Sequence, residues 1–334
     1  MSQGTTGGGG KRPTAVITGG LGYIGQSLAF ALKSAGEPVL VIDRRAIPGQ
    51  VPGIGVITGS IADPAVWRQV ADESQPTAIY HCAGLISVTE SLARPAEYFR
   101  ENVAAGIAML DHMLSLIGPV PVVFSSSAAV YGAPERLPLR EDAALRPMSP
   151  YGVTKRQFEE VLAAYAAPYG IPWVALRYFN AAGMVGPVRE QHDPETHLLP
   201  RVADAVRAGG APVIYGSDYP TADGTAVRDY IHVADLAEAH QAAARYLRQG
   251  GESGPINLGS GQGTSVTQVL EAFAAVSGAV LRPQRQPRRA GDPPELVADI
   301  GRARTVLRWA PRRSGIREIV AEVWQGRMTR RAAQ

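Results

Sequence analysis

Short apolar segments alternate with helical patterns from residue 14 to about 182, and this alternation constrains the fold more than any other feature. The apolar segments are rich in β-branched residues: "TAVIT", "PVLVID", "GVITG", "TAIYHCAG", "VPVVFSSS" and "WVALRYFN". Helical patterns lie between them, two of them at about 96–117 and 151–168. Strands that alternate with helices in this way predict an α/β fold with a doubly wound parallel sheet of the Rossmann type.

The regular alternation ends near residue 182, in the segment "GMVGPVREQHDPETH". We therefore predict a first domain over 13–182 and a smaller α/β domain over 183–328. Within 229–259, "VRDYIHVADLAEAH" and "INLGSG" are expected to cross back to the first sheet. Both ends of the chain are predicted to be tails, over 1–12 and 329–334.

Composition excludes several classes of protein. The 33 Lys and Arg residues exceed the 30 Asp and Glu residues by only three, and the basic runs near the C-terminus contain no interleaved aromatic residues. This pattern favours a solvated surface or a site for an anionic substrate over nucleic-acid binding. Cys82 is the single cysteine, so no intrachain disulfide can form. The sequence offers neither a signal peptide nor a membrane span, and we expect a cytoplasmic protein.

A glycine-rich segment, "TGGLGYIG", follows the first expected strand. Gly19, Gly22 and Gly25 allow a tight turn and a close approach of the backbone to a pyrophosphate, at the N-terminus of a helix. Asp43 ends the second expected strand, where a carboxylate can accept hydrogen bonds from both ribose hydroxyls of an adenosine. Asp43 would repel a 2′-phosphate, which favours NAD over NADP, although the neighbouring Arg44 could hold such a phosphate.

Tyr151 and Lys155 are spaced i, i+4 near the start of an expected helix, so their side chains lie on one face. Lys155 is one of only three lysines, with Lys11 and Lys33. Lowering a phenol pKa by about 3 units takes about 4 kcal/mol, and an ammonium about 5 Å away supplies roughly 3 kcal/mol. An oxidised nicotinamide ring nearby would add to this effect, and the pair therefore suits general base catalysis. The alternative is an inert tyrosine ring packed on an aliphatic stem.

Motifs over residues 14–325 resemble the extended short-chain dehydrogenase/reductase family, and within it the UDP-glucose 4-epimerases, also called UDP-galactose 4-epimerases. They include "HCAGLISVTES", "FSSSAAVYG", "SPYGVTK", "LRYFNAAG", "YGSDYPTADGTAVRDYIHVADLA", "NLGSGQGTSV" and "RRAGDPPELVAD". The resemblance implies that Tyr151 is the catalytic base, and that Lys155 tunes it and binds the nicotinamide ribose. It places Ser127 at the end of the fourth strand, bonded to the 4-hydroxyl of the sugar.

Related enzymes that eliminate water or carbon dioxide carry acids just after the residue equivalent to Ser127. Here those positions are Ala128 and Ala129. The resemblance therefore implies reversible inversion of the 4-hydroxyl of a UDP-hexose through a 4-keto intermediate, with NAD as cofactor. A 4-epimerase of another nucleotide sugar and a non-catalytic NAD-sensing regulator are the alternatives. The family also implies a homodimer formed through the helices near 96–117 and 151–168.

The resemblance implies two sets of ligand-binding residues. Those expected at NAD are Gly19, Gly22, Tyr23, Ile24, Gly25, Asp43, Ser60, Ile61, Ala83, Gly84, Asn102, Tyr151, Lys155 and Tyr178. Those expected at the UDP-hexose are Ser127, Asn180, His197, Leu198, Tyr215, Arg228, Arg289, Asp292 and Leu296.

Within the second set, Arg228 and Arg289 are expected at the diphosphate and ribose, Asp292 at ribose hydroxyls, Asn180 at the diphosphate and Tyr215 at uracil. A structural ion pair of Arg228 with Asp229, a core position for Tyr215 and a surface position for Arg289 are the alternatives.

Several positions depart from the family pattern. Ser60 replaces an aspartate expected at the adenine amine, Ile86 replaces a lysine and Ala129 replaces a threonine. Leu296 occupies the position that limits room for an N-acetyl group, which predicts a preference for UDP-glucose and UDP-galactose. The spacing of His192 and His197 in "HDPETH" does not match a zinc motif, and we expect no metal site.

Overall fold

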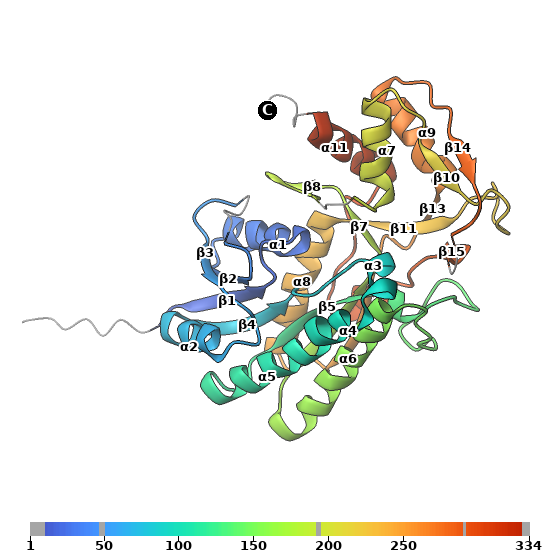
Figure 1. The fold of residues 1–334 in the computed structure, drawn as a ribbon. Helices are drawn as coiled ribbons and strands as arrows, with labels where there is room; N and C mark the ends of the chain where they lie inside the picture. Colours follow the sequence, from blue (N-terminus) through green and yellow to red (C-terminus); the bar gives the residue numbers. More distant parts are fainter. Residues whose placement is uncertain (1–10, 47–50, 192–194, 290–291, 329–334) are drawn as a thin grey trace, which may run out of the picture.

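Seven parallel strands form the central sheet of the computed structural model, which describes residues 11–46, 51–191, 195–289 and 292–328. Their order across the sheet is β3-β2-β1-β4-β5-β6-β12, and Figure 1 labels the first five of them. The strands are β1 Pro13–Thr18, β2 Val39–Asp43, β3 Gly55–Thr58, β4 Gln75–His81, β5 Val122–Ser127, β6 Trp173–Tyr178 and β12 Gly254–Leu258. The predicted α/β fold with a parallel, doubly wound sheet is confirmed.

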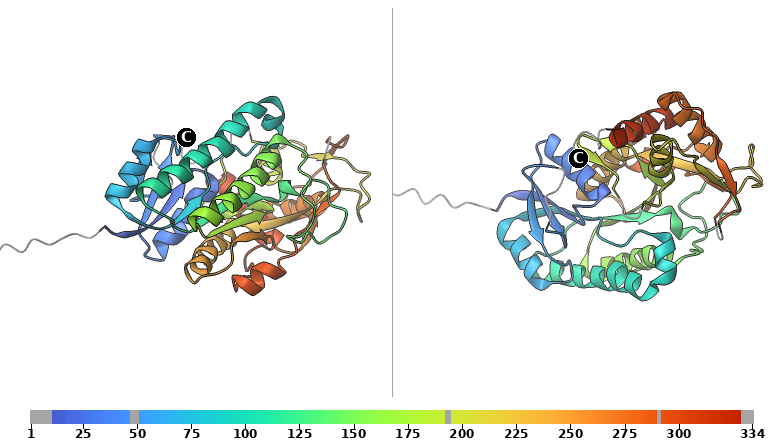
Figure 2. Two further views of the ribbon diagram at one scale, coloured as in Figure 1. Left: turned by 90° about the horizontal axis from the view of Figure 1, so that it is seen from below. Right: turned by 45° about the horizontal axis from the view of Figure 1, so that its top comes forward.

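Helices cover both faces of this sheet. On one face lie α1 (Tyr23–Ser34) and α8 (Val233–Arg248); on the other lie α2 (Pro64–Glu73), α5 (Ala105–Leu116) and α6 (Pro150–Tyr169). Side chains alternate along each strand, so Ala15 and Ile17 of β1 join the α1 side of the core while Val16 joins the other side. Figure 2 shows the teal and green α5 and α6 running together along the sheet.

The helix expected at about 96–117 is interrupted. It consists of α4 (Pro95–Phe99), a π-helical turn η1 (Arg100–Ala104) and α5, and the short helix α3 (Val88–Ala93) precedes it. Asn102 lies buried in the π-helical turn, where its side chain bonds Leu85 and Thr154. Such turns are frequent where a helix side chain serves a site. The helix expected at 151–168 is α6, which Ser149 caps and Gly170 ends in a left-handed conformation.

The second part of the molecule is built around β11 (Val227–His232), which pairs with β7, β13 and β15. Three helices, α7, α9 and α11, pack together beside it (Figure 1). Of the segment 229–259, α8 and β12 join the first sheet, whereas β11 stays in this smaller one. The elements are β7 Asn180–Ala182, β8 Met184–Val185, β9 Val188–Arg189, α7 Leu198–Arg207, β10 Val213–Tyr215, β13 Gly263–Ser265, α9 Val266–Ser277, β14 Gln284–Gln286, β15 Glu295–Leu296, α10 Gly301–Val306 and α11 Ile316–Met328.

Among the described residues, no helix combines the length and the apolar character that crossing a membrane requires.

A buried ion pair ties α6 to the sheet. Arg177 of β6 and Glu159 of α6 are 3% and 5% exposed, and their side chains form a bidentate contact with atoms 2.6 and 3.0 Å apart. Ser126 of β5 also donates a hydrogen bond to Glu159. The neighbouring residue Glu160 instead pairs with Arg156 on the exposed side of α6. Adjacent glutamates thus make one buried and one solvent-exposed ion pair.

We expect Glu159→Gln to lower the free energy of unfolding by about 3 kcal/mol, because removing one partner leaves the Arg177 charge buried without its counterion. Glu160→Gln is the matched control and should cost at most about 0.5 kcal/mol. Urea unfolding at neutral pH measures both. Equal losses in the two variants would contradict a special role for the buried pair.

Candidate active site

A cavity of about 640 Å³ opens at the carboxyl ends of the central strands and extends to the second part of the molecule. This edge of a parallel sheet is where ligands bind in open α/β folds. Of the residues expected at NAD, the cavity is lined by Gly19, Gly22, Tyr23, Ile24, Gly25, Asp43, Ser60, Ile61, Ala83, Gly84, Tyr151, Lys155 and Tyr178. Of those expected at the UDP-hexose, it is lined by Ser127, Asn180, His197, Leu198 and Leu296.

The glycine turn brings the start of α1 to the cavity. Gly19 has a φ of 67°, and a Cβ there would lie 2.6 Å from the Ala83 backbone. A Cβ on Gly25 would lie 2.4 Å from the carbonyl oxygen of Gly19, so α1 can approach the turn only with glycine at this position. Gly22 is the N-cap of α1, and no side chain caps the helix there. The helix therefore presents backbone N–H groups and positive potential to an anion such as a pyrophosphate.

Asp43 ends β2 at the same end of the cavity and accepts four hydrogen bonds. They come from the backbone N–H groups of Leu21 and Arg45 and from two nitrogens of the Arg45 side chain, at 2.9–3.0 Å. Burial alone would raise the pKa of Asp43, but these hydrogen bonds and the Arg45 charge lower it below its ordinary value. The carboxylate is therefore ionised at neutral pH. Arg44 pairs with Glu101 across the cavity wall at 2.8 Å.

The cavity is also lined by Ser127, Tyr151 and Lys155. Ser127 is the last residue of β5, the fifth strand along the chain. Its expected position on the fourth strand was wrong by one, because the segment "GVITG", which was not counted there, forms β3. Ser149 caps α6 and Pro150 begins it, which fixes Tyr151 in the first turn. Tyr151 and Ser127 line the same cavity.

Burial shifts the pKa values of both Lys155 and Tyr151. The Lys155 Nζ donates to the Ser125 carbonyl at 2.8 Å and lies 5.8 Å from the Tyr151 ring centroid. Burial lowers the pKa of Lys155 to about 8, although Cys82 and Glu159 act in the opposite direction. Burial also raises the pKa of Tyr151, and the Ser127 hydrogen bond opposes this only in part. Removal from water thus disfavours phenolate and ammonium alike in the protein without a bound cofactor, and the role of the pair as a general base stays a prediction.

A buried polar network behind Lys155 was not predicted from the sequence. Ser125 contacts the Cys82 sulfur at 3.3 Å and His240 Nε2 at 3.1 Å. His240 comes from α8, and burial lowers its pKa to about 4, so the ring is neutral. Its Nδ1 lies 2.8 Å from the Leu236 carbonyl, which requires the proton on that nitrogen. The position of His240 beside Ser125 depends on how α8 packs against the sheet, and nothing in the helical sequence pattern around His240 predicts it.

Asn102 does not line the cavity. Its side chain accepts from the Leu85 N–H at 2.7 Å and donates to the Leu85 carbonyl at 3.0 Å and to Thr154. Gly84 beside it has a φ of 150°, and a Cβ there would lie 2.9 Å from the Asn102 oxygen. Asn102 therefore holds the loop that forms one wall of the cavity.

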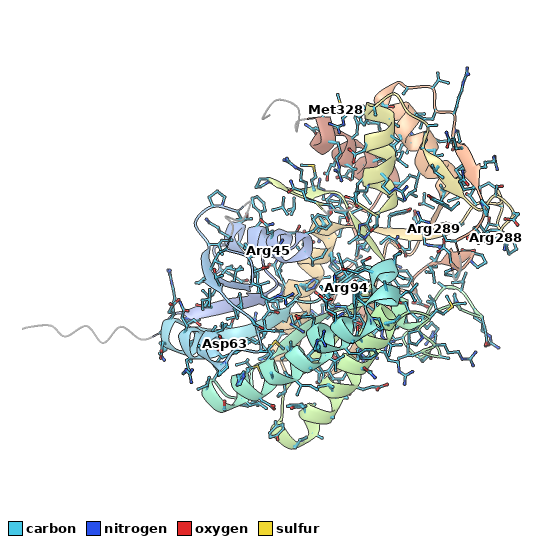
Figure 3. The ribbon with its side chains drawn as sticks, viewed as in Figure 1. Arg45, Asp63, Arg94, Arg288, Arg289 and Met328 are labelled. Carbon is cyan, nitrogen blue, oxygen red and sulfur yellow. The ribbon has the colours of Figure 1, made fainter. Side chains whose placement is uncertain are left out.

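Four of the residues expected at the UDP-hexose are not among those that line the cavity: Tyr215, Arg228, Arg289 and Asp292. The Arg289 guanidinium stacks 4.2 Å from the Tyr215 ring centroid, and Arg228 pairs with Asp292. The alternative pairing of Arg228 with Asp229 does not occur, because Asp229 accepts backbone N–H groups of Ser260, Gly261 and Ala298. In Figure 3, Arg289 lies in the second part of the molecule and Arg45 near α1.

His197 is the N-cap residue of α7 and faces two carboxylates. Its Nδ1 lies 2.9 Å from Glu190 and 3.4 Å from Glu195. Burial would lower the pKa of His197, but the two carboxylates raise it to about 10, so the ring carries a positive charge at neutral pH. These three residues are of types that can hold a metal ion, but in this structure they pair with one another. His192, the other histidine of this segment, lies outside the described residues.

Comparison with known proteins gives consistent matches. Residues 15–259 match the sequence pattern of the NAD dependent epimerase/dehydratase family. A UDP-glucose 4-epimerase from Azospirillum brasilense is 42% identical over 317 residues, covering 92% of this chain and 90% of that protein.

Two solved structures are similar along nearly the whole chain. That of UDP-glucose 4-epimerase from Brucella ovis in complex with NAD has a TM-score of 0.89 at 39% identity and covers 94% of this chain and 98% of its own. The structure of UDP-glucose 4-epimerase from Bifidobacterium longum in complex with NAD+ and UDP has a TM-score of 0.86 at 31% identity. This match covers 96% of this chain and 100% of that chain.

We expect the wild-type protein without cofactor to gain stability relative to Lys155→Met as the pH rises from about 8 to about 10. In this window the folded lysine has lost its proton while the unfolded lysine still binds one, so the free energy of unfolding rises by up to about 1.4 kcal/mol per pH unit. Below pH 8 the lysine is protonated in both the folded and the unfolded protein, so this gain in stability is absent. Denaturant unfolding of both proteins across this range measures the difference, and parallel curves would contradict the lowered pKa.

Proposed function

The chain belongs to the NAD dependent epimerase/dehydratase family, and we propose that it is a 4-epimerase, an isomerase that interconverts UDP-glucose and UDP-galactose with bound NAD. The observation that carries this proposal is the cavity in which Ser127, Tyr151 and Lys155 meet, below a turn suited to a pyrophosphate. Ala128 and Ala129 line the same wall and offer no acid for elimination. The similar enzymes are named UDP-glucose 4-epimerases, and this chain matches them over nearly their full length.

The proposed reaction begins with proton transfer from the sugar 4-hydroxyl to the Tyr151 oxygen, with Ser127 in contact with both groups. A bound NAD would supply the acceptor and the donor for the hydride of carbon 4. The site must hold UDP while the flat 4-keto sugar presents its opposite face, which inverts the 4-hydroxyl. Tyr151 then gives the proton back to the same oxygen, and the reaction has no net oxidation. Lys155 holds the ribose hydroxyls and favours the phenolate.

The residues present fit NAD. An uncapped helix start, glycines at which a Cβ would collide, and an ionised carboxylate at the end of β2 are the features that a dinucleotide requires. We propose that the NAD-binding residues named from the sequence act at this site, with Asn102 acting through the Leu85 loop. The positive nicotinamide beside Tyr151 would oppose the effect of burial on the phenol pKa.

We propose that the nucleotide sugar enters from the second part of the molecule. His197 and Leu198 at the start of α7 would face the diphosphate or sugar, with Asn180 near the diphosphate. Tyr215, Arg228, Arg289 and Asp292 would bind uridine, which requires uracil to take the place of the Arg289 guanidinium over Tyr215. Accordingly we assign NAD binding to 13–182 with 229–259, and the nucleotide sugar mainly to 183–328.

Three finer assignments are part of the proposal. Two copies would pair through α5 and α6, where Leu116 and Tyr169 are exposed. The protein would act in the cytoplasm, where nucleotide sugars are interconverted, and in galactose metabolism. A regulator without catalysis is not favoured, because such a protein needs no Ser127, Tyr151 and Lys155 lining one cavity.

We expect Tyr151→Phe and Lys155→Arg each to lower kcat for conversion of UDP-galactose to UDP-glucose by at least about 100-fold. Tyr151→Phe removes the proton acceptor. Lys155→Arg keeps the charge but replaces a compact ammonium by a wide fork in a buried space. Lys33→Arg, at an exposed lysine, is the matched control and should leave kcat unchanged. Near-normal turnover in either active-site variant would refute the assignment.

Leu296 gives a specificity prediction. It lies in β15 and lines the cavity, so Leu296→Ala should make room for an N-acetyl group. The ratio of kcat/KM for UDP-N-acetylglucosamine to that for UDP-glucose should rise at least about tenfold, as is typical when a pocket gains space for a few carbon atoms. Leu92→Ala, at an exposed leucine outside the cavity lining, is the control. An unchanged ratio in Leu296→Ala would show that another residue limits the sugar.

A further inference from the structure

Two arginines face one aromatic ring in the second part of the molecule. The guanidinium of Arg289 lies 4.2 Å from the centroid of the Tyr215 ring, and that of Arg201 lies 5.9 Å from the same centroid. Both distances are within the range of a cation–π contact. Arg201, and to a smaller extent Arg289, lower the pKa of Tyr215, because a nearby guanidinium favours the phenolate. Arg201 was not among the residues expected at the nucleotide sugar, and folding brings it to Tyr215.

Two neighbouring elements carry these arginines to the ring. Tyr215 ends β10, which pairs in parallel with β14, and Arg289 follows β14 by three residues. Helix α7 packs in the same apolar cluster as β10, to which Leu199 of the helix and Ile214 of the strand belong. Arg201 comes two residues after Leu199 and is exposed. The guanidiniums thus reach Tyr215 from two separate segments of the chain.

Neither Arg201 nor Arg289 forms an ion pair with a carboxylate in the described part of the chain. Other arginines of the second part do: Arg207 with Asp204, Arg228 with Asp292, and Arg288 with Asp218. The charges of Arg201 and Arg289 are therefore not balanced by a nearby acid, and they repel each other. An anion within reach of both guanidiniums would remove this repulsion.

Helix α7 connects Arg201 to the cavity. His197, its N-cap residue, and Leu198, its first residue, line the cavity. The Arg201 N–H donates to the His197 carbonyl at 3.2 Å, so Arg201 lies one helical turn beyond His197 on the same face. His197 is also a cation, but Glu190 and Glu195 pair with it. Of these two cations, Arg201 is the one whose charge is available to a ligand.

We propose that Arg201 is a further substrate-binding residue: together with Arg289 it forms a pair of guanidiniums that leaves the Tyr215 ring and binds the diphosphate of the nucleotide sugar. This inference rests on the proposed function, in which uracil takes the place of the Arg289 guanidinium over Tyr215. A cation–π contact at an exposed site is weaker than the charge-assisted hydrogen bonds that a guanidinium gives to phosphate oxygens. The diphosphate therefore draws both guanidiniums from the ring as the base takes their place.

The test compares UDP and uridine as ligands of the full-length protein with NAD present. Calorimetric titration measures UDP, and NMR titration measures the weaker binding of uridine. Arg201→Ala should raise the dissociation constant of UDP at least about tenfold, because a charge-assisted contact is lost. The dissociation constant of uridine, which has no phosphate, should change less than about twofold. Arg201→Lys, which keeps the charge, should lose less affinity for UDP than Arg201→Ala.

Arg207→Ala is the matched control, because Arg207 is an exposed arginine of the same helix that pairs with Asp204. It should change the dissociation constant of UDP less than about threefold. Three outcomes would overturn the inference alone: a loss of UDP affinity in Arg201→Ala that falls short of about tenfold, an equal loss for UDP and uridine, or an equal loss in Arg207→Ala. If the wild type does not bind UDP, the proposed function fails with it.

Discussion

Parallel pairing of seven strands is the constraint on which the rest of the molecule depends. It brings the carboxyl ends of β1, β2, β4, β5 and β6 to one edge, and there the chain places the glycine turn, Asp43 and Ser127. Every strand must be followed by a crossover, and α6 is the crossover that returns Tyr151 and Lys155 to the same edge. The site is thus a direct consequence of sheet topology.

Burial works against the chemistry at this edge. It disfavours the ammonium of Lys155 and the phenolate of Tyr151, and it keeps His240 neutral. The same exclusion of water strengthens every remaining electrostatic contact. Part of the catalytic activation is therefore expected from bound ligands, whose charge replaces the water that the fold has removed.

Ion pairs complete the surroundings of the site. Glu159 and Arg177 fix α6 on the sheet, Glu190 and Glu195 hold His197 as a cation, and Arg45 occupies Asp43. None of these partners follows from spacing along the chain. Asp43 and Arg45 are only two residues apart, yet the sequence drew attention to Arg44 beside them, which the fold turns towards Glu101 instead.

The sequence by itself determined the sheet, the glycine turn, and the placement of Tyr151 and Lys155 on one helix face, because strand alternation, glycine geometry and i, i+4 spacing are local properties of a chain. Ser127 was named only through resemblance to a family. Tertiary structure alone decided which charges meet and how deeply each is buried. It interrupted the expected helix at Asn102, joined His240 to Ser125, kept Arg228 from Asp229 and set the pKa of Lys155. Burial and pairing depend on neighbours brought together by folding, and these have no fixed separation in the sequence.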